Sequence, residues 1–406
     1  MYDTFVALSN TTLDGFTIFG KTSWRPKAEP QLITYSPQQD NIDEDMVQCT
    51  HIGIPQVSKT NAVLMSQPYW MFGCEMGVNK DNVAIGNEPI YTREQVQKEG
   101  LLGTDLVRLG LERSTDAEEA LGVIIDLLEE HGQGGDYRND DVYWSYHNSF
   151  LIADPDEAYV IETADKWWIV EKVEDFRILS NQLSIHGKGD RRKEGIIDYA
   201  VKQGYCENEE EFDFANTFMK EQLPTKLPLR FKNSLNKDVV QKNKGKITIE
   251  KVLEFFRELE DGETEYEDYF SAALQISHLK FAKTSTHWFT GGPLSKYNII
   301  KPYIFPIEDQ RVNKPGPYSR LKNDWFWNLN KNYIRPEKGD VREFKEKMYL
   351  NEMKAIERNI FDKVRKLEHQ ENTLEPVEYR KKMDEVNNEV WKKAYELVSL
   401  KPQKTQ

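Results

Sequence analysis

The chain opens on a segment that predicts a β-hairpin beginning at its first residue. Residues 1–8 mix aromatic and β-branched residues with polar ones, which is typical of a strand. Residues 10–15 supply turn formers, above all Asp14-Gly15, and residues 16–20 predict the second strand. Because free chain ends usually fray, a strand at the start predicts an N-terminus held inside a sheet. An α-amino group there can act as a base, although these residues alone favour an edge strand without chemistry.

Length and charge narrow the class of protein. The 406 residues are 38% hydrophobic and 30% charged, with a formal net charge of −14. This length predicts two or three domains, or one large domain with an appendage. The acidic balance argues against nucleic acid as a partner and against an anionic membrane surface. No secretory leader and no apolar run of roughly eighteen residues occur, so we expect no membrane span and a cytoplasmic location.

Cysteines, histidines and short motifs give no established catalytic or metal pattern. Three cysteines, Cys49, Cys74 and Cys206, indicate a reducing compartment without a disulfide framework. The histidines are scattered, and Cys49-x-His51 lacks a second ligand pair, so a structural role is favoured there. Neither a GxSxG elbow nor a Walker or Rossmann fingerprint is present. We therefore expect no metal and no cofactor.

The periodicity predicts helices inserted between antiparallel strands. Residues 104–113 predict one helix, and a second follows with a capping box of Thr115 and Glu118 and an end at Gly132. Residues 248–262 predict another amphipathic helix. The predicted strands are short, polar-apolar segments bounded by turn residues. They cover residues 31–35, 50–54, 61–66, 83–87, 149–153, 157–163, 167–172, 177–185, 272–276 and 286–290.

The composition changes after Phe305. Residues 306–340 hold prolines and aromatics without periodicity and predict a linker packed on the core. Residues 341–368 and 376–400 predict long charged helices that cover the core, pair as a helical hairpin, or form a dimer seam. The predicted organisation is a main domain over residues 1–305, the linker, and a helical extension over residues 341–406.

Several blocks occur in a fixed order along the main domain. They are GCEMGVNKDNVAIGNE (73–88), LLGTDLVRLGLERSTDAEEAL (101–121), EEHGQGG (129–135), SYHNSFLIADPDEAYVIETADKWWIVEKV (145–173), ILSNQLSI (178–185) and HWFTGGP…KPYIF (287–305). With the N-terminal hairpin and the basic segment after it, these blocks resemble the secernins. Secernins in turn resemble the cysteine-type dipeptidases of the N-terminal-nucleophile hydrolase superfamily.

The resemblance implies a fold and a mechanism. The fold would be α+β, a four-layer αββα sandwich of two antiparallel sheets, followed by the helical extension. The nucleophile would be the first residue of the mature chain, with its own α-amino group as the base. Asn87 and Asn181 would hold the oxyanion, Arg25 would orient groups in the site, and a peptide or small amide would be the ligand.

This chain departs from the family pattern at three positions. Tyr2 stands where typical members have the nucleophilic Cys, and a phenol with a pKa of about 10 is a poor substitute for a thiolate. The family segment resembling GKNSDRP is GKTSWRP here, which puts Thr22 and Trp24 at altered site positions. Tyr2 is also too large for the usual removal of Met1. The leading hypothesis is therefore a secernin-like protein with lost or strongly impaired peptidase activity and, by family analogy, a role in regulated secretion.

Two alternatives stay open. An active dipeptidase or amidohydrolase would need a processed N-terminus, for example a cleavage after Asp3 that exposes Thr4 as the nucleophile. Among the cysteines, only Cys74 lies near a block expected to line the site. A helical assembly protein would instead use residues 341–400 as the seam of a homo-oligomer.

Overall fold

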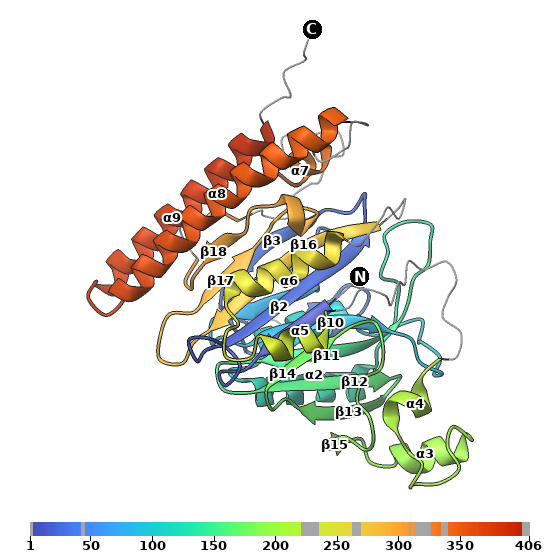
Figure 1. Ribbon diagram of the computed structural model, residues 1–406. Coiled ribbons are helices and arrows are strands. Elements are labelled where there is room, and N and C mark those ends of the chain that lie inside the picture. The colour runs from blue at the N-terminus through green and yellow to red at the C-terminus, as the bar shows by residue number, and fades with distance from the viewer. Residues whose placement is uncertain are drawn as a thin grey trace.

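Two antiparallel sheets packed face to face form the centre of the molecule (Figure 1). The computed structural model describes residues 3–41, 45–220, 235–261, 269–307, 310–312, 326–333 and 340–399. Within these residues, no helix is both long and apolar enough to cross a membrane. The expected α+β class with two antiparallel sheets, outer helices and a helical C-terminal region is confirmed.

The first sheet has the strand order β14-β1-β2-β16-β17-β18. Its strands are β14 (Phe176–Leu179), β1 (Asp3–Ala7), β2 (Thr17–Pro26), β16 (Tyr269–Leu279), β17 (Thr286–Phe289) and β18 (Lys301–Tyr303). Strand β1 pairs with β2 on one side and β14 on the other. The start of the described chain therefore lies in the interior of a sheet and not at its edge.

The second sheet has the order β15-β13-β12-β11-β10-β9-β8-β3. Its strands are β15 (Arg191–Arg192), β13 (Trp167–Lys172), β12 (Ala158–Ala164), β11 (His147–Ala153), β10 (Ala84–Ile90), β9 (Met76–Asn79), β8 (Val63–Pro68) and β3 (Gln31–Ser36). The predicted meander is present as β11, β12 and β13. Two small two-stranded sheets, β4 (Gln39–Asp40) with β7 (Lys59–Thr60) and β5 (Met46–Gln48) with β6 (Gly53–Pro55), lie beside it.

Helices cover the outer face of each sheet. Helices α1 (Gly103–Glu112) and α2 (Ala117–His131) pack on the second sheet, and α6 (Ile249–Asp261) packs on the first. Three shorter helices, α3 (Ile196–Lys202), α4 (Phe214–Phe218) and α5 (Lys237–Lys242), lie in the segment that precedes α6. Neighbouring residues of β2 face opposite sides of the first sheet. Gly20 faces α6, where an added Cβ would be 2.7 Å from Phe256, and Lys21 faces the second sheet.

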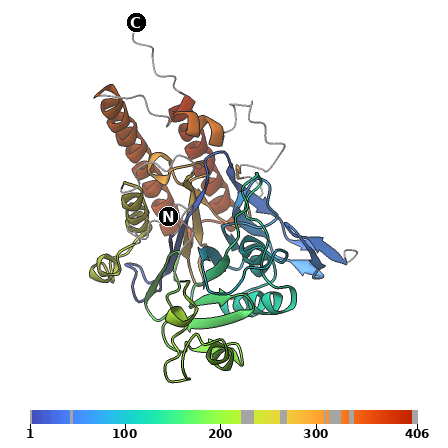
Figure 2. The same cartoon turned by 90° about the vertical axis from the view of Figure 1, so that its right-hand side faces the viewer.

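Helices α8 (Asp340–Gln370) and α9 (Pro376–Ser399) form an antiparallel hairpin that we call the C-terminal hairpin. It lies at the opposite end of the molecule from α3 and α4 (Figure 2). Its side chains join the main core: Trp391 donates its indole N–H to the Tyr303 hydroxyl at 2.8 Å, and Asn387 donates to the Pro302 carbonyl at 2.7 Å. The hairpin therefore covers the β18 edge of the first sheet.

Some local predictions are wrong. Asp116, not Thr115, caps α2 by accepting from the Glu119 N–H at 2.7 Å, because the cap lies one residue later than the pattern indicated. The strand predicted over 177–185 ends as β14 at Leu179, since the following backbone N–H groups of Ser184 and Ile185 bond to a buried side-chain carboxylate.

The predicted linker contains one element that the sequence pattern did not indicate. Residues 306–340 contain a helix, α7 (Phe326–Tyr333), whose Phe326 ring packs edge-on against Trp391. Most of the remaining linker lies outside the described residues.

Candidate functional site

A buried ionic cluster joins the two sheets next to the N-terminal strand. Lys21 of β2 places its Nζ 2.9 Å from Glu88 Oε1 on β10, and both side chains are 0% exposed. The Thr4 hydroxyl donates to the same Glu88 oxygen. Thr4 and Lys21 are direct partners in the β1–β2 ladder, so one strand pair presents both groups to Glu88. We call Thr4, Lys21 and Glu88 the inter-sheet cluster.

Arg25 lies farther along β2, where the chain crosses from the first sheet to the second. Its Nε and Nη2 bind Glu29 at 2.6 and 2.8 Å, and its Nη1 lies 3.3 Å from Glu75 Oε1. Nη2 also donates to the Tyr137 carbonyl at 2.7 Å. The Arg25 side chain is 0% exposed, and such bidentate, charge-assisted bonds hold it in one position.

Burial dominates the protonation behaviour of the carboxyl groups here. Removal from water raises the pKa of Glu88 to about 7, against the lowering effects of Lys21 and the Thr4 hydrogen bond. Burial likewise raises the pKa of Glu75, which Arg25 and Lys21 partly offset. A carboxyl beside a hydroxyl, with a pKa near neutrality, can accept a proton from that hydroxyl. Thr4 is itself 0% exposed, so this pair has no contact with solvent.

Asn87 and Glu88 are neighbours on β10 and point to opposite faces of the second sheet. Asn87 donates to Asn148 Oδ1 at 3.0 Å, and Asn148 donates to the Tyr137 hydroxyl at 2.9 Å. The same hydroxyl accepts from the N–H of Gly103, the first residue of α1, at 2.6 Å. The Asn87 side chain therefore faces the helical layer, while Glu88 faces the first sheet. Among the described residues, the buried Asn87 Oδ1 has no hydrogen-bond partner.

Asn181 lies two residues beyond the end of β14 and donates to the Pro89 carbonyl of β10 at 3.0 Å. It is buried, as are Arg25 and Asn87. Arg25 bonds to the backbone carbonyl of Tyr137, and Asn87 is connected through Asn148 to the hydroxyl of the same tyrosine. Asn181 bonds to β10 at Pro89, two residues past Asn87. Asn181 and Asn87 are therefore connected through β10 and Arg25 and Asn87 through Tyr137, but each of the three side chains has different direct partners.

The altered positions Thr22 and Trp24 are both buried on β2. Thr22 pairs with Asp3 across the β1–β2 ladder. Trp24 belongs to an aromatic cluster beside Arg25, and its ring lies 6.0 Å from that of Tyr269. The other buried members of this cluster are Met71, Tyr91, Leu102, Tyr137, Trp144 and Tyr146. Trp24 thus packs among apolar side chains, and Glu29 and Glu75 are the carboxylates that bind Arg25.

Tyr2, predicted at the nucleophile position, lies outside the described residues, as does Met1. Cys74 is fully buried, and burial raises the pKa of its thiol, which keeps the sulfur protonated. Burial also raises the pKa of Cys49 to about 12. Within the described part of the chain, no group of three or more metal-binding side chains is close enough to hold an ion.

Sequence reasoning missed Lys21, Glu88, Glu75 and Glu29. A signal was present for two of them, because Glu88 is the one charge in its strand, and Lys21 and Arg25 are the charges in a strand that is otherwise uncharged. A charge at such a position needs a partner once it is buried. Which two charges are partners depends on how the sheets face each other, and that is a property of the tertiary structure.

No protein-family model matches this chain. Among solved structures, it is similar to a mutant of conjugated bile acid hydrolase from Clostridium perfringens, with a TM-score of 0.45 and 12% identity over 79% of this chain and 97% of that one. For a penicillin V acylase from Agrobacterium tumefaciens, the TM-score is 0.41 and the identity 9%, over 75% of this chain and 86% of that one. Both TM-scores are below 0.5, so the layered architecture is assigned from this chain's own strand order.

Proposed function

We propose that this protein is a secernin-like relative of the cysteine-type dipeptidases whose own peptidase activity is lost or strongly impaired. Its site would bind a peptide or small amide without cleaving it efficiently. The resemblance of the sequence blocks supports the family, and Tyr2 at the nucleophile position supports the impairment. A role in regulated secretion follows from the family analogy alone.

The observation that carries the proposal is the engagement of Arg25. In the family pattern this arginine orients groups in the site. Here its guanidinium is fully buried and bonded to Glu29, Glu75 and the Tyr137 carbonyl. Breaking such a buried, hydrogen-bonded set to bind a substrate carboxylate would cost several kcal/mol, roughly 3–5 by comparison with other buried pairs. We therefore assign Arg25 a structural role inside the protein rather than the role of a substrate ligand.

The contacts of Asn87, the residue expected to stabilise the oxyanion, also argue against efficient catalysis. Its amide nitrogen donates to Asn148, and its side chain faces the α1 layer. Stabilising an oxyanion requires a donor within about 3 Å of the charge that develops. An Asn87 held in this way offers no such donor to the Thr4 side of β10, so loss of the nucleophile and loss of the donor go together.

The direct test is hydrolysis of a dipeptide panel by the purified full-length protein. We expect no turnover above background, and no effect of a thiol reagent. Thiol-sensitive turnover by the unmodified chain would refute the impairment. Intact-mass measurement should also find Met1 retained, because a large second residue blocks its removal.

A pair of variants separates a missing nucleophile from a site that is altered throughout. Tyr2→Cys supplies the thiol and also permits removal of Met1, while Tyr2→Ala permits removal of Met1 without a nucleophile. Hydrolysis regained only in Tyr2→Cys would show that Tyr2 alone blocks the reaction. With Arg25 and Asn87 engaged as described, we expect both variants to stay inactive.

The Thr4–Glu88 hydrogen bond favours a second candidate function, an amidohydrolase activated by processing. Cleavage after Asp3 would give Thr4 a free α-amino group, beside a carboxyl of raised pKa and Lys21. Intact mass decides between the candidates: a chain starting at Thr4, active in the parent and inactive in Thr4→Val, would establish this one. A chain starting at Met1 excludes it.

A further inference from the structure

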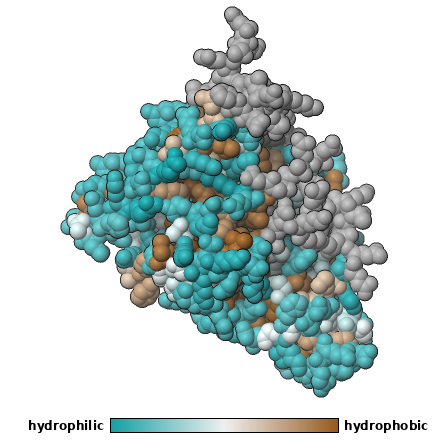
Figure 3. Space-filling view, viewed as in Figure 1, coloured by the Kyte–Doolittle hydropathy of each residue, from teal (hydrophilic) through white to brown (hydrophobic). Residues whose placement is uncertain are grey.

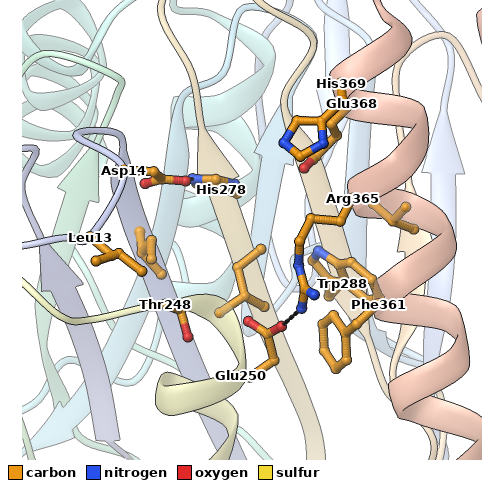
Figure 4. A pocket seen from close by; sticks show the side chains of 13 residues that line it. Leu13, Asp14, Thr248, Glu250, His278, Trp288, Phe361, Arg365, Glu368 and His369 are labelled. Carbon is orange, nitrogen blue, oxygen red and sulfur yellow. Dashed lines mark hydrogen bonds and ion pairs between the residues drawn. The ribbon is translucent and has the colours of Figure 1, made fainter.

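A cleft of about 260 Å³ lies on the outer face of the first sheet, away from the inter-sheet cluster. It is bounded by the β1–β2 turn, the start of α6 and the last turns of α8 (Figure 4). In the view of Figure 3, brown hydrophobic surface appears between the teal surface of the C-terminal hairpin and that of the sheet domain. Ile18, Trp288, Phe361 and Val364 line the interior of the cleft and are all buried.

A buried donor in this cleft lacks an acceptor. Trp288 is 1% exposed, and its indole N–H has no hydrogen-bond partner among the described residues. In Figure 4, the indole nitrogen lies on the side of the ring towards Arg365. A buried donor without a partner destabilises the fold, and an acceptor supplied by a bound molecule would remove that cost. His278 Nδ1 is a second buried polar atom of the lining without a partner in the described part of the chain.

The rim of the cleft carries three carboxylates, two of which are paired with an arginine or a lysine. Its lining contains three carboxylates, Asp14, Glu250 and Glu368, but a single guanidinium, Arg365, besides two histidines. Arg365 is engaged by Glu250 across the mouth, and Lys280 binds Glu368. Asp14 is half-exposed and lies 3.1 Å from the Nε2 of His278. Within the described part of the chain, Asp14 forms no ion pair with a lysine or arginine, so its exposed carboxylate can accept a hydrogen bond from an ammonium group.

We propose that this cleft binds a small apolar amine that also carries a hydroxyl or carbonyl oxygen. The ammonium group would lie at the rim beside Asp14, and the apolar body would contact Ile18, Val364 and the aromatic rings. The oxygen would accept the Trp288 indole N–H. A carboxylate ligand is disfavoured by Asp14 at the rim, and a purely apolar ligand would leave the indole N–H unpaired.

Three probes of similar shape test the proposed chemistry on the full-length protein. Phenylalaninol carries the amine, the ring and the hydroxyl. The second probe, 3-phenylpropanol, lacks the amine, and the third, 3-phenylpropionate, lacks the amine and has a carboxylate in place of the hydroxyl-bearing carbon. We expect phenylalaninol to bind about ten-fold or more tightly than 3-phenylpropanol, because one charge-assisted hydrogen bond contributes that much, and 3-phenylpropionate to bind most weakly. Calorimetric titration gives the three dissociation constants.

The Trp288 indole N–H gives a readout that only this cleft can produce. Its proton–nitrogen NMR signal, assigned by its loss in Trp288→Phe, should move downfield when phenylalaninol binds, as expected for a newly formed hydrogen bond. Phenylalaninol binding that leaves this signal unchanged would overturn the placement of the oxygen.

A matched pair of variants tests the rim. Asp14→Asn removes the proposed partner of the amine at a half-exposed position, so the fold should survive. It should abolish the preference for phenylalaninol over 3-phenylpropanol. Asp198→Asn, an exposed carboxylate on α3 at the other end of the molecule, should leave the preference intact. Undiminished preference in Asp14→Asn, binding of 3-phenylpropionate as tight as that of phenylalaninol, or no phenylalaninol binding at millimolar concentration would each overturn the proposal.

Discussion

Two ion pairs on opposite faces of the first sheet show how burial changes the contribution of an ion pair to stability. Lys21–Glu88 lies between the sheets with both side chains 0% exposed, whereas Arg365–Glu250 spans the outer cleft with exposures of 53% and 40%. Each pairs one cation with one glutamate. The inner pair is removed from water, so each of its charges needs the other as a partner, whereas water already solvates the charges of the outer pair.

The space around the two ion pairs differs in the same way. Around Lys21 and Glu88, backbone and side chains leave no room: a Cβ added at Gly86 would lie 2.4 Å from Lys21 Cδ. Around Arg365 and Glu250 there is an open cleft with an unsatisfied indole donor. The inner cluster therefore holds two sheets together, and the outer face keeps space for a ligand.

The largest effect should come from removing one inner charge. Lys21→Met leaves Glu88 buried without its cation, so we expect the free energy of unfolding at about pH 8 to fall by roughly 3–5 kcal/mol. Urea denaturation measures it. The double variant Lys21→Met/Glu88→Gln should recover a large part of the loss, since no unpaired charge remains. A loss below about 1 kcal/mol in the single variant would contradict the comparison.

The next effect is a pH dependence carried by Glu88. Its pKa is raised from 4.5 to about 7 in the folded protein, so the fold favours the protonated form. Its contribution is present in full below about pH 4.5 and is lost as pH rises through about 7. The difference in unfolding free energy between the parent and Glu88→Gln should therefore shrink over this range, by at most about 3 kcal/mol.

Taking that difference removes an opposing effect. Burial lowers the pKa of His147 and His287 to about 3, so these two residues favour the fold at higher pH and oppose it as pH falls below 6.5. The parent and the variant share this behaviour. A parallel pH profile for the parent and Glu88→Gln would show that folding does not raise the pKa of Glu88.

A smaller effect should follow from adding one methyl group between the sheets. Gly86→Ala forces the Lys21 stem aside and should cost about 1–3 kcal/mol by thermal or urea unfolding. Gly122→Ala is the matched control, because it lies within α2 and an added Cβ there meets nothing within 4 Å. The control should stabilise the protein by roughly 0.5–1 kcal/mol. Equal effects at both positions would contradict tight packing around Lys21.

The smallest effect is expected at the outer pair. Arg365→Gln removes an exposed ion pair and should lower the unfolding free energy by less than about 1 kcal/mol, with a loss that diminishes in high salt. The same urea titration with and without added salt measures both. A loss comparable with that of Lys21→Met would remove the distinction between the two faces.

Much of the architecture was predictable from local pattern. The N-terminal hairpin, the meander and the two C-terminal helices follow from turn residues and from periods of two or 3.6 residues. Even so, the cap at Asp116 and the early end of β14 were missed. Ser184 and Ile185 leave the strand ladder because the Glu162 carboxylate, distant in sequence, accepts their N–H groups.

The candidate site divides in the same way. The sequence determined which residue types stand at positions 2, 22, 24, 25, 87 and 181, and that residues 87 and 88 of one strand must face opposite sides. Only the tertiary structure decided that Glu88 meets Lys21, that Arg25 meets Glu29 and Glu75, and that Asn87 turns to the helical layer. Local periodicity assigns a side chain to a face, but the partner of a buried charge depends on which distant strand packs against that face.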